Sequence, residues 1–172
     1  MTFISDSLNR IKPSATMVIT AKATQLKREG KKVIGLSSGE PDFDTPQHVK
    51  QAAIDAINSG YTKYTNIEGI PELRQSIVEK FKKDNDLNYD VSNVIVGTGG
   101  KQILFNALMS SLNKDDEVII PAPYWVSYPD MTLLAGGKPI FVDCSSETNF
   151  KLTGEALEKV ITKNSKWLIL NS

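Results

Sequence analysis

The residues best suited to binding an anion lie in a glycine-rich segment near the middle of the chain. Positions 97–101 read Gly-Thr-Gly-Gly-Lys, between a short apolar run and an amphipathic segment. Gly99 and Gly100 would let backbone amides approach an anion at the positive end of a helix, and Lys101 could add a charged donor. The spacing matches neither the dinucleotide fingerprint nor the Walker loop, because no Ser or Thr follows the final Gly-Lys. The segment indicates either a phosphate site or an ordinary structural turn with a solvated lysine.

An aromatic segment at 124–129 is the second candidate, and it reads Tyr-Trp-Val-Ser-Tyr-Pro. Like 97–101 it follows a predicted strand, so a parallel sheet would place both segments at one edge. Trp125 offers an apolar face and an indole donor, which suit a planar heteroaromatic ligand or a nearby carboxylate. The alternative is that these aromatics cover the surface or an oligomer interface. Tyr64 has a hydroxyl that could reach a phosphate, although a loop tyrosine commonly packs and leaves its tip in water.

The histidine, the cysteine and the clustered acidic residues of the chain do not suggest a further catalytic or metal site. His48 and Cys144 are the single histidine and the single cysteine of the chain, which excludes a thiol protease dyad, a zinc site and an internal disulfide. His48 is expected on the surface of a helix. The acidic residues Glu40, Asp42 and Asp44 precede a predicted helix start, where interaction with the helix dipole is a sufficient explanation.

Helical patterns dominate the first half of the chain. A helix is predicted over 15–29, and a loop follows at 37–46. Thr45 is expected to cap a second helix, with Pro46 at its first position and Gly60 after its end. A third helix opens at 71 with Leu, Ile and Phe spaced by four residues. The expected buried stripe of the second helix is Val49, Ala53, Ala56 and Ile57.

Beyond residue 85 short apolar runs alternate with amphipathic segments, a pattern typical of an α/β fold with a parallel sheet covered on both faces. In such a sheet the ligand lies beyond the carboxyl ends of the strands, so the loops starting near residues 97, 121 and 171 are the informative ones. The predicted strands are 94–96, 117–120, 139–142 and 167–170, and the predicted helices are 101–112, 128–135 and 154–161.

The composition is that of a globular protein. The 172 residues are 40% hydrophobic and 23% charged, with 20 basic and 20 acidic residues. A net charge of zero predicts no general affinity for nucleic acid or anionic membrane, and no apolar run reaches the ~20 residues of a membrane span. The first residues form too short an apolar stretch for a signal peptide, so a cytoplasmic location is expected.

Four segments taken together are similar to one family. They are 38–46 (Ser-Gly-Glu-Pro-Asp-Phe-Asp-Thr-Pro), Tyr64, 99–102 (Gly-Gly-Lys-Gln) and 124–129. Their order and separation resemble the class I pyridoxal phosphate-dependent aminotransferases, in particular the bacterial aspartate aminotransferases that often also accept prephenate. The resemblance spans essentially the whole chain.

The resemblance implies a three-layer α/β large domain of PLP fold type I, with a mostly parallel sheet of seven strands. It also implies a small domain built from both chain ends and a homodimer whose interface completes each site. On this basis residues 1–45 are expected to form the amino-terminal segment of the small domain with the entry loop. Residues 46–172 are expected to form the first part of the large domain, which binds pyridoxal 5'-phosphate.

Cofactor contacts follow from the same resemblance. Gly99, Gly100 and Lys101 resemble the turn that holds the cofactor phosphate. Trp125 resembles the aromatic residue that stacks on the pyridine ring and also contacts bound substrate. Tyr64 resembles the tyrosine that reaches across the dimer to the phosphate of the neighbouring subunit.

Substrate contacts are fewer. Gly39 resembles the position whose backbone meets the substrate carboxylate, and Lys12 resembles a basic residue near the substrate entrance that is linked to dicarboxylate and prephenate acceptance. The family's Asn-Pro-Thr-Gly turn, its aspartate for the pyridine nitrogen, its Schiff-base lysine and its substrate arginine are all expected beyond residue 172. No lysine of this chain matches the Schiff-base motif.

The resemblance therefore implies the amino-terminal part of an aminotransferase that acts on amino acids and 2-oxo acids, inactive by itself. Two alternatives remain open. One is a relative acting on aromatic, branched or alanine-type amino acids. The other is a truncated, non-catalytic module that keeps ligand binding or dimerisation.

Overall fold

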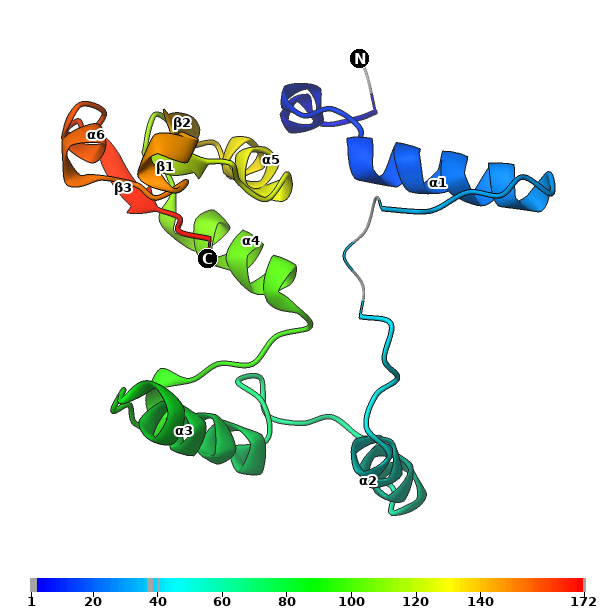
Figure 1. Cartoon of the computed structure of the whole chain (residues 1–172). Helices are drawn as coiled ribbons and strands as arrows, with labels where there is room; N and C mark the ends of the chain where they lie inside the picture. The colour runs from blue at the N-terminus through cyan, green and yellow to red at the C-terminus, as the bar shows by residue number, and fades with distance from the viewer. Residues whose placement is uncertain (1–2, 37–38, 40, 172) are drawn as a thin grey trace. The chain divides into compact units, whose positions relative to one another are not determined.

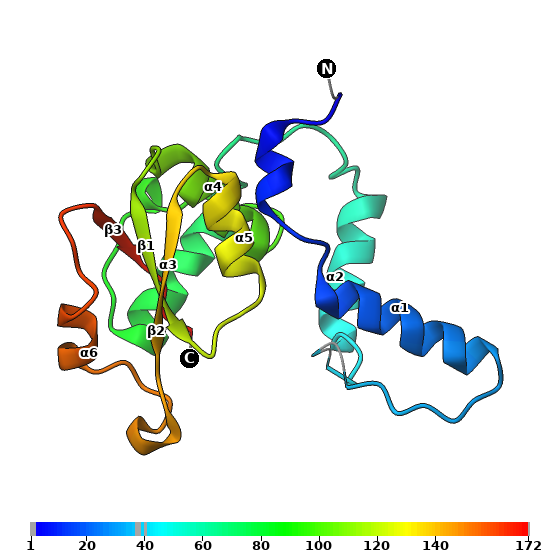
Figure 2. The same cartoon turned by 90° about the horizontal axis from the view of Figure 1, so that it is seen from above.

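The computed structural model describes residues 3–36, 39 and 41–171, and Figures 1 and 2 show the course of the chain. The chain forms two compact units. The sheet unit comprises 1–18 and 98–172, and the helical unit comprises 19–97. Three residues of the predicted loop lie outside the described residues: Ser37, Ser38 and Glu40.

Three parallel strands form the centre of the sheet unit, in the order β2-β1-β3. They are β1 (Glu117–Ala122), β2 (Lys138–Asp143) and β3 (Ser165–Leu168). Residues 118–120 of β1 are almost completely buried, so this strand is covered on both faces. The predicted parallel sheet is confirmed. The predicted burial holds for β1 but is wrong for β2 and β3, whose residues are mostly half-buried or exposed.

Helices pack on both sides of this sheet. They are α4 (Gly100–Ser111), α5 (Ser127–Leu134) and the short α6 (Gly154–Glu158). Figure 2 shows α4 and α5 on one side and α6 on the other. The strand order explains this, because the connections β1–β2 and β2–β3 cross the sheet in opposite directions. Crossovers between parallel strands are almost always right-handed, so the two connections are expected to place their helices on opposite faces. The core beneath α4 and α5 contains Leu108, Leu112, Val118, Ile120, Tyr128, Met131 and Ile169.

The remaining elements of the sheet unit are short. Two 3-10 turns, Asp6–Arg10 (η1) and Ser146–Thr148 (η3), belong to it. The guanidinium of Arg10 donates to the carbonyl oxygen of Leu133 at 3.1 Å, which fastens η1 to the end of α5. The helix α1 (Ala15–Arg28) begins in this unit and continues into the helical unit.

Two carboxylates tie the amino ends of the strands together. Glu117 is buried and accepts a hydrogen bond of 2.6 Å from the hydroxyl of Thr162. Asp116 accepts from the backbone N–H of Asn113 at 2.7 Å and from the ammonium of Lys166 at 2.9 Å. These hydrogen bonds, the Asn113 amide first, lower the pKa of Asp116 below its usual value because they stabilise the carboxylate.

The helical unit contains α2 (Gln47–Asn58), α3 (Pro71–Asn85) and the 3-10 turn η2 (Val91–Asn93). Pro71 stands at the start of α3 as predicted. The predicted start of the second helix is wrong by one residue, because Pro46 is the cap and no side chain, Thr45 included, accepts a capping hydrogen bond.

The predicted buried stripe of α2 is also wrong. No residue of α2 is buried, and Val49 and Ile57 are 47% and 63% exposed. An apolar stripe indicates a face that needs a partner, but it does not say that the partner belongs to the same segment of chain.

The strand predicted at 94–96 is not formed. The amide of Val96 instead donates to the carbonyl oxygen of Glu68 at 2.9 Å, and no sheet pairing involves this segment within the described part of the chain. Apolar composition alone does not make a strand, because a strand needs a neighbour for its hydrogen bonds.

Other boundaries also differ from prediction, and the larger differences include those of the last helix and the last strand. The helix predicted over 154–161 ends at Glu158, and the strand predicted over 167–170 is β3, which begins at Ser165 and ends at Leu168. Beyond β3 the ladder continues with a hydrogen bond from the amide of Ile169 to the carbonyl of Ile119. Within the described ranges, no helix has the length and apolar character to cross a membrane.

Candidate functional site

A cleft of about 270 Å³ lies in the sheet unit where α4 begins. Its wall includes residues that follow β1 and β3, so it lies beyond the carboxyl ends of the strands, where parallel sheets generally bind ligands. The structure brings three of the predicted site residues together here: Gly100, Lys101 and Trp125. The described residues that line it are Gly100, Lys101, Leu104, Trp125, Tyr128, Met131 and Asn171.

The amino end of α4 supplies unpaired donors. Gly99 caps the helix with a φ of +85°, a conformation that strains any residue with a side chain. Its carbonyl oxygen accepts from the amides of Gln102 and Ile103. The amides of Gly100 and Lys101 make no hydrogen bond within the described residues. Nothing lies within 4 Å of a Cβ built at either glycine, so open space adjoins these donors.

The charge at the cleft favours an anion. Lys101 is exposed and forms no ion pair with any described residue. Among the described residues no carboxylate lines the cleft, and the helix dipole adds partial positive charge at the same end of α4. A phosphate group would therefore meet two free amides and an ammonium group.

Trp125 gives the cleft its aromatic surface. It is 49% exposed and lies two residues before α5, which begins at Ser127. The other two aromatics of the segment are used for packing: Tyr124 stacks on Phe141 with ring centroids 5.1 Å apart, and Tyr128 is 8% exposed in the core. The segment thus combines a packing role with one accessible indole.

The other predicted site residues lie elsewhere. Lys12 belongs to the sheet unit, exposed in the segment between η1 and α1, and is not part of the cleft lining. Gly39 and Tyr64 belong to the helical unit. Tyr64 is fully exposed and borders a pocket of about 410 Å³ together with Tyr61, Lys63 and residues at the end of α2.

The lining residues Leu104, Tyr128, Met131 and Asn171 were not predicted as site residues from the sequence. Tyr128 and Met131 lie three residues apart on α5, and Leu104 lies one turn into α4. Such helical spacing indicates core packing and carries no signal for a cleft. Asn171 had a weak signal, because it is the first polar residue after a buried strand at the ligand-binding edge.

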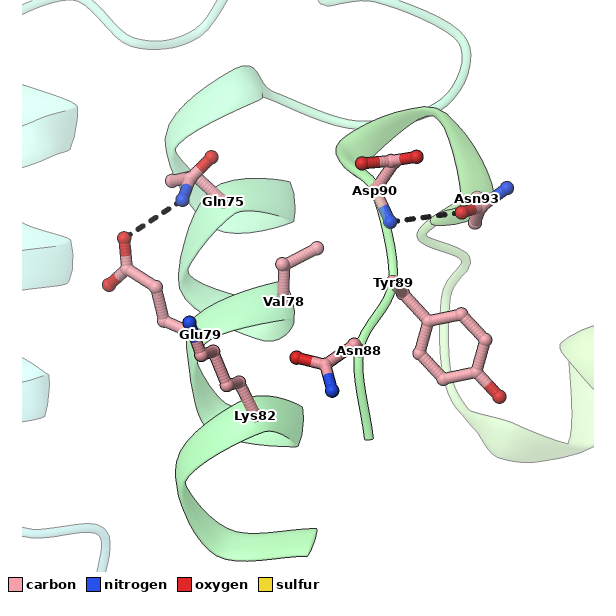
Figure 3. Close-up of a pocket in the computed structure, with 8 residues that line it drawn as sticks. All are labelled: Gln75, Val78, Glu79, Lys82, Asn88, Tyr89, Asp90 and Asn93. Atoms are coloured by element: carbon pink, nitrogen blue, oxygen red, sulfur yellow. Dashed lines mark hydrogen bonds between the residues drawn. The ribbon is translucent and has the colours of Figure 1, made fainter. Parts of the chain in front are cut away.

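Another pocket, of about 560 Å³, lies in the helical unit between α3 and the segment 88–93 (Figure 3). Four of its eight lining residues are joined in two hydrogen-bonded pairs. Gln75 donates to the carboxylate of Glu79 at 2.9 Å, and the amide of Asp90 donates to the side-chain oxygen of Asn93 at 2.9 Å. None of the predicted site residues lines it, so the cleft at α4 is the better candidate.

Comparison with known proteins identifies the family of the chain. A family model described as aminotransferase class I and II matches residues 31–172. A probable aspartate/prephenate aminotransferase of Rickettsia bellii is 60% identical over all 172 residues, which are 43% of that protein. An aspartate/prephenate aminotransferase of Cereibacter sphaeroides is also 60% identical, with the same shares covered.

Solved structures agree in fold. The aspartate aminotransferase of Rhizobium meliloti superposes with a TM-score of 0.94 at 50% identity, covering the whole chain and 43% of that protein. The aspartate aminotransferase of Thermus thermophilus with maleate gives a TM-score of 0.96 at 45% identity, covering 45% of that protein. The chain thus spans less than half the length of these relatives.

Proposed function

We propose, from the premise that the chain belongs to the class I and II aminotransferase family, that it is the amino-terminal part of an aspartate aminotransferase. The reaction would convert aspartate and 2-oxoglutarate to oxaloacetate and glutamate. The names of relatives that are 60% identical add prephenate as a second acceptor. The single observation that carries the proposal in this chain is the cleft in which free helix amides and Lys101 adjoin an exposed indole.

Pyridoxal 5'-phosphate is the cofactor of class I aminotransferases in general, and the cleft suits it. A dianionic phosphate needs donors and positive charge, which the unpaired amides of Gly100 and Lys101 and the Lys101 ammonium supply. A pyridine ring needs an apolar platform, which the half-exposed Trp125 offers. The volume of about 270 Å³ lies near the lower end of the range for small-ligand sites, about 300 Å³.

The bound cofactor would supply an electron sink for cleavage of a bond at the substrate α-carbon. The residues of this chain would bind and orient it. Gly99, whose positive φ shapes the turn, and the amides that follow would anchor the phosphate end. Trp125 would hold the ring plane and limit access of water to that face.

Other roles rest on the family likeness. We propose that Gly39 meets the substrate carboxylate, that Lys12 contributes to dicarboxylate or prephenate acceptance, and that Tyr64 contacts the cofactor phosphate of the neighbouring subunit in a homodimer. The exposed hydroxyl of Tyr64 supports the last assignment, since no described residue of its own chain covers it.

The domain assignment is also a proposal. Residues 1–45 would form the amino-terminal segment of the small domain, and residues 46–172 would form the first part of the large domain. A cytoplasmic location is consistent with the buried free thiol of Cys144, since reducing compartments keep such thiols unpaired.

The test uses the full-length protein that contains this chain. It should transaminate 2-oxoglutarate with aspartate, and prephenate should replace 2-oxoglutarate as acceptor when glutamate or aspartate is the donor. Product formation is followed with alanine and phenylalanine as competing donors. Equal kcat/KM for alanine or phenylalanine and for aspartate would refute the aspartate assignment, and failure to bind pyridoxal phosphate would refute the family function altogether.

A matched pair of variants tests whether the cleft is the site. Trp125→Ala removes the proposed platform and should weaken cofactor binding by about tenfold, because burying an aromatic stack contributes about 1 kcal/mol or more. Trp167→Phe is the control, because Trp167 packs against the core and donates to Ser111 at 2.9 Å outside the cleft. Equal effects of the two substitutions on cofactor binding would place the site elsewhere.

A further inference from the structure

One hydrogen bond joins two residues of the cleft to which no cofactor contact has been assigned. The hydroxyl of Tyr128 donates to the side-chain oxygen of Asn171 at 3.0 Å. Both residues line the cleft, and they lie 43 positions apart in the sequence. The bond therefore connects α5 to the segment that leaves β3.

The two residues joined by this hydrogen bond differ in burial. Tyr128 is 8% exposed and fixed in the core by its ring. Its own amide and carbonyl are also engaged, since the amide donates to the carbonyl of Trp125 and the carbonyl accepts from the buried Thr132 hydroxyl. Asn171, in contrast, is exposed and follows Leu170, which is 67% exposed. The fixed partner is the tyrosine, and the asparagine is the residue being held.

The last ladder bond before Asn171 is the one from the Ile169 amide to the Ile119 carbonyl. Between that point and Asn171 the chain has no other hydrogen bond to the sheet unit within the described residues. The Tyr128 hydroxyl is thus the contact that sets the course of the chain as it passes the cleft. It also selects the side-chain oxygen of Asn171 as its acceptor, which leaves the amide NH₂ of Asn171 for another partner.

We propose that Tyr128 is a positioning residue that acts through Asn171: it holds the segment after β3 against α5 and thereby fixes one wall of the cofactor cleft. The inference rests on the proposed function, because it takes the cleft as the site of pyridoxal phosphate. Loss of the hydroxyl would leave the ring packing intact and release Asn171, so the cleft would have to be ordered when the cofactor binds.

The experiment is a double-mutant cycle in the full-length enzyme, with Tyr128→Phe, Asn171→Ala and the double variant. The dissociation constant of pyridoxal phosphate is measured by equilibrium dialysis of each apoenzyme. Each single substitution should raise this constant by about threefold to tenfold, the effect of one hydrogen bond. The double variant should be no weaker than the weaker single variant, since both changes remove the same contact.

Tyr124→Phe is the matched control. Tyr124 comes from the same segment and packs against the same core, and its hydroxyl forms no hydrogen bond among the described residues. It should bind the cofactor as the unmodified enzyme does. Thermal unfolding of the apoenzymes adds a second readout, because a role in folding alone would lower the Tm of Tyr128→Phe and leave the dissociation constant unchanged.

Unchanged dissociation constants in both single variants overturn the inference, and so do additive effects in the double variant. If Tyr128→Phe does not fold, Asn171→Ala decides alone, since Asn171 is exposed and its removal spares the core. An unmodified enzyme that binds no pyridoxal phosphate refutes the proposed function and the inference with it. An unmodified enzyme that binds, with variants that match it, refutes the inference only.

Discussion

The sharpest test of the phosphate site is Gly100→Ala in the full-length enzyme, because its effects on stability and on binding should have opposite signs. Gly100 is the first residue of α4 and its φ does not lie in the left-handed region. No atom lies within 4 Å of the position that an alanine Cβ would occupy. The cofactor-free protein should therefore gain about 0.4–1 kcal/mol of stability, since alanine reduces the entropy of the unfolded chain.

Cofactor binding should weaken in the same variant. The open space beside the Gly100 amide is where a phosphate oxygen would accept its hydrogen bond, and a methyl group would occupy part of it. Loss of one hydrogen bond to a charged group costs about 2 kcal/mol, which corresponds to roughly a 30-fold higher dissociation constant. Urea unfolding of the apoenzyme and equilibrium dialysis with pyridoxal phosphate measure the two effects separately.

Gly154→Ala is the control for this prediction. Gly154 is likewise the first residue of a helix, α6, and an added Cβ would again meet nothing within 4 Å. It does not line the cleft. It should give a similar gain in stability with unchanged cofactor affinity. If Gly100→Ala binds the cofactor as tightly as Gly154→Ala does, the amino end of α4 is not the phosphate site.

Three further predictions concern charge, pH and packing. Lys101→Ala should raise the dissociation constant of pyridoxal phosphate about fivefold at low salt, as expected for an exposed ion pair, and less at high salt, which dialysis at two ionic strengths would show. The Asn113 amide and Lys166 lower the pKa of Asp116 in the folded protein. The contribution of Asp116 to stability is therefore complete above its unfolded pKa of about 4, and it is lost as the pH falls through its folded pKa. Asp116→Asn should therefore flatten the fall in stability below about pH 4 in urea titrations, and an unaltered slope would contradict the assignment. Gly137→Ala should destabilise the protein by about 1–3 kcal/mol in the same assay, because the new Cβ would stand 3.1 Å from the carbonyl oxygen of Asp116 at a buried position, and full stability would disprove this packing.

The sequence predicts most elements of the sheet unit because their signals are local. The apolar residues 118–120 lack polar alternation, as expected for a strand buried on both faces, and they are the most deeply buried part of the sheet. The segment 94–96 has the same composition but no strand neighbour among the described residues, so it bonds to Glu68 instead. The apolar stripe of α2 likewise indicates that this helix packs against a partner, but the local pattern does not identify that partner.

The residues of the candidate site also divide into those that local motifs predict and those that only the folded chain brings together. The glycines at 99 and 100 and Lys101 are adjacent in sequence, and the chemistry of a helix start makes them candidates for an anion site, with a structural turn as the alternative. Trp125 could be placed beside them because parallel strands bring their carboxyl ends to one edge. The pairing of Tyr128 with Asn171 depends on a register between β1 and β3 that includes an irregularity between Glu117 and Val118, and no local pattern encodes this. A contact of this kind, made between residues 43 positions apart, is found only when the strands are in place. Motifs therefore predict candidate ligand contacts, whereas the residues that hold those candidates in position are found only in the folded chain.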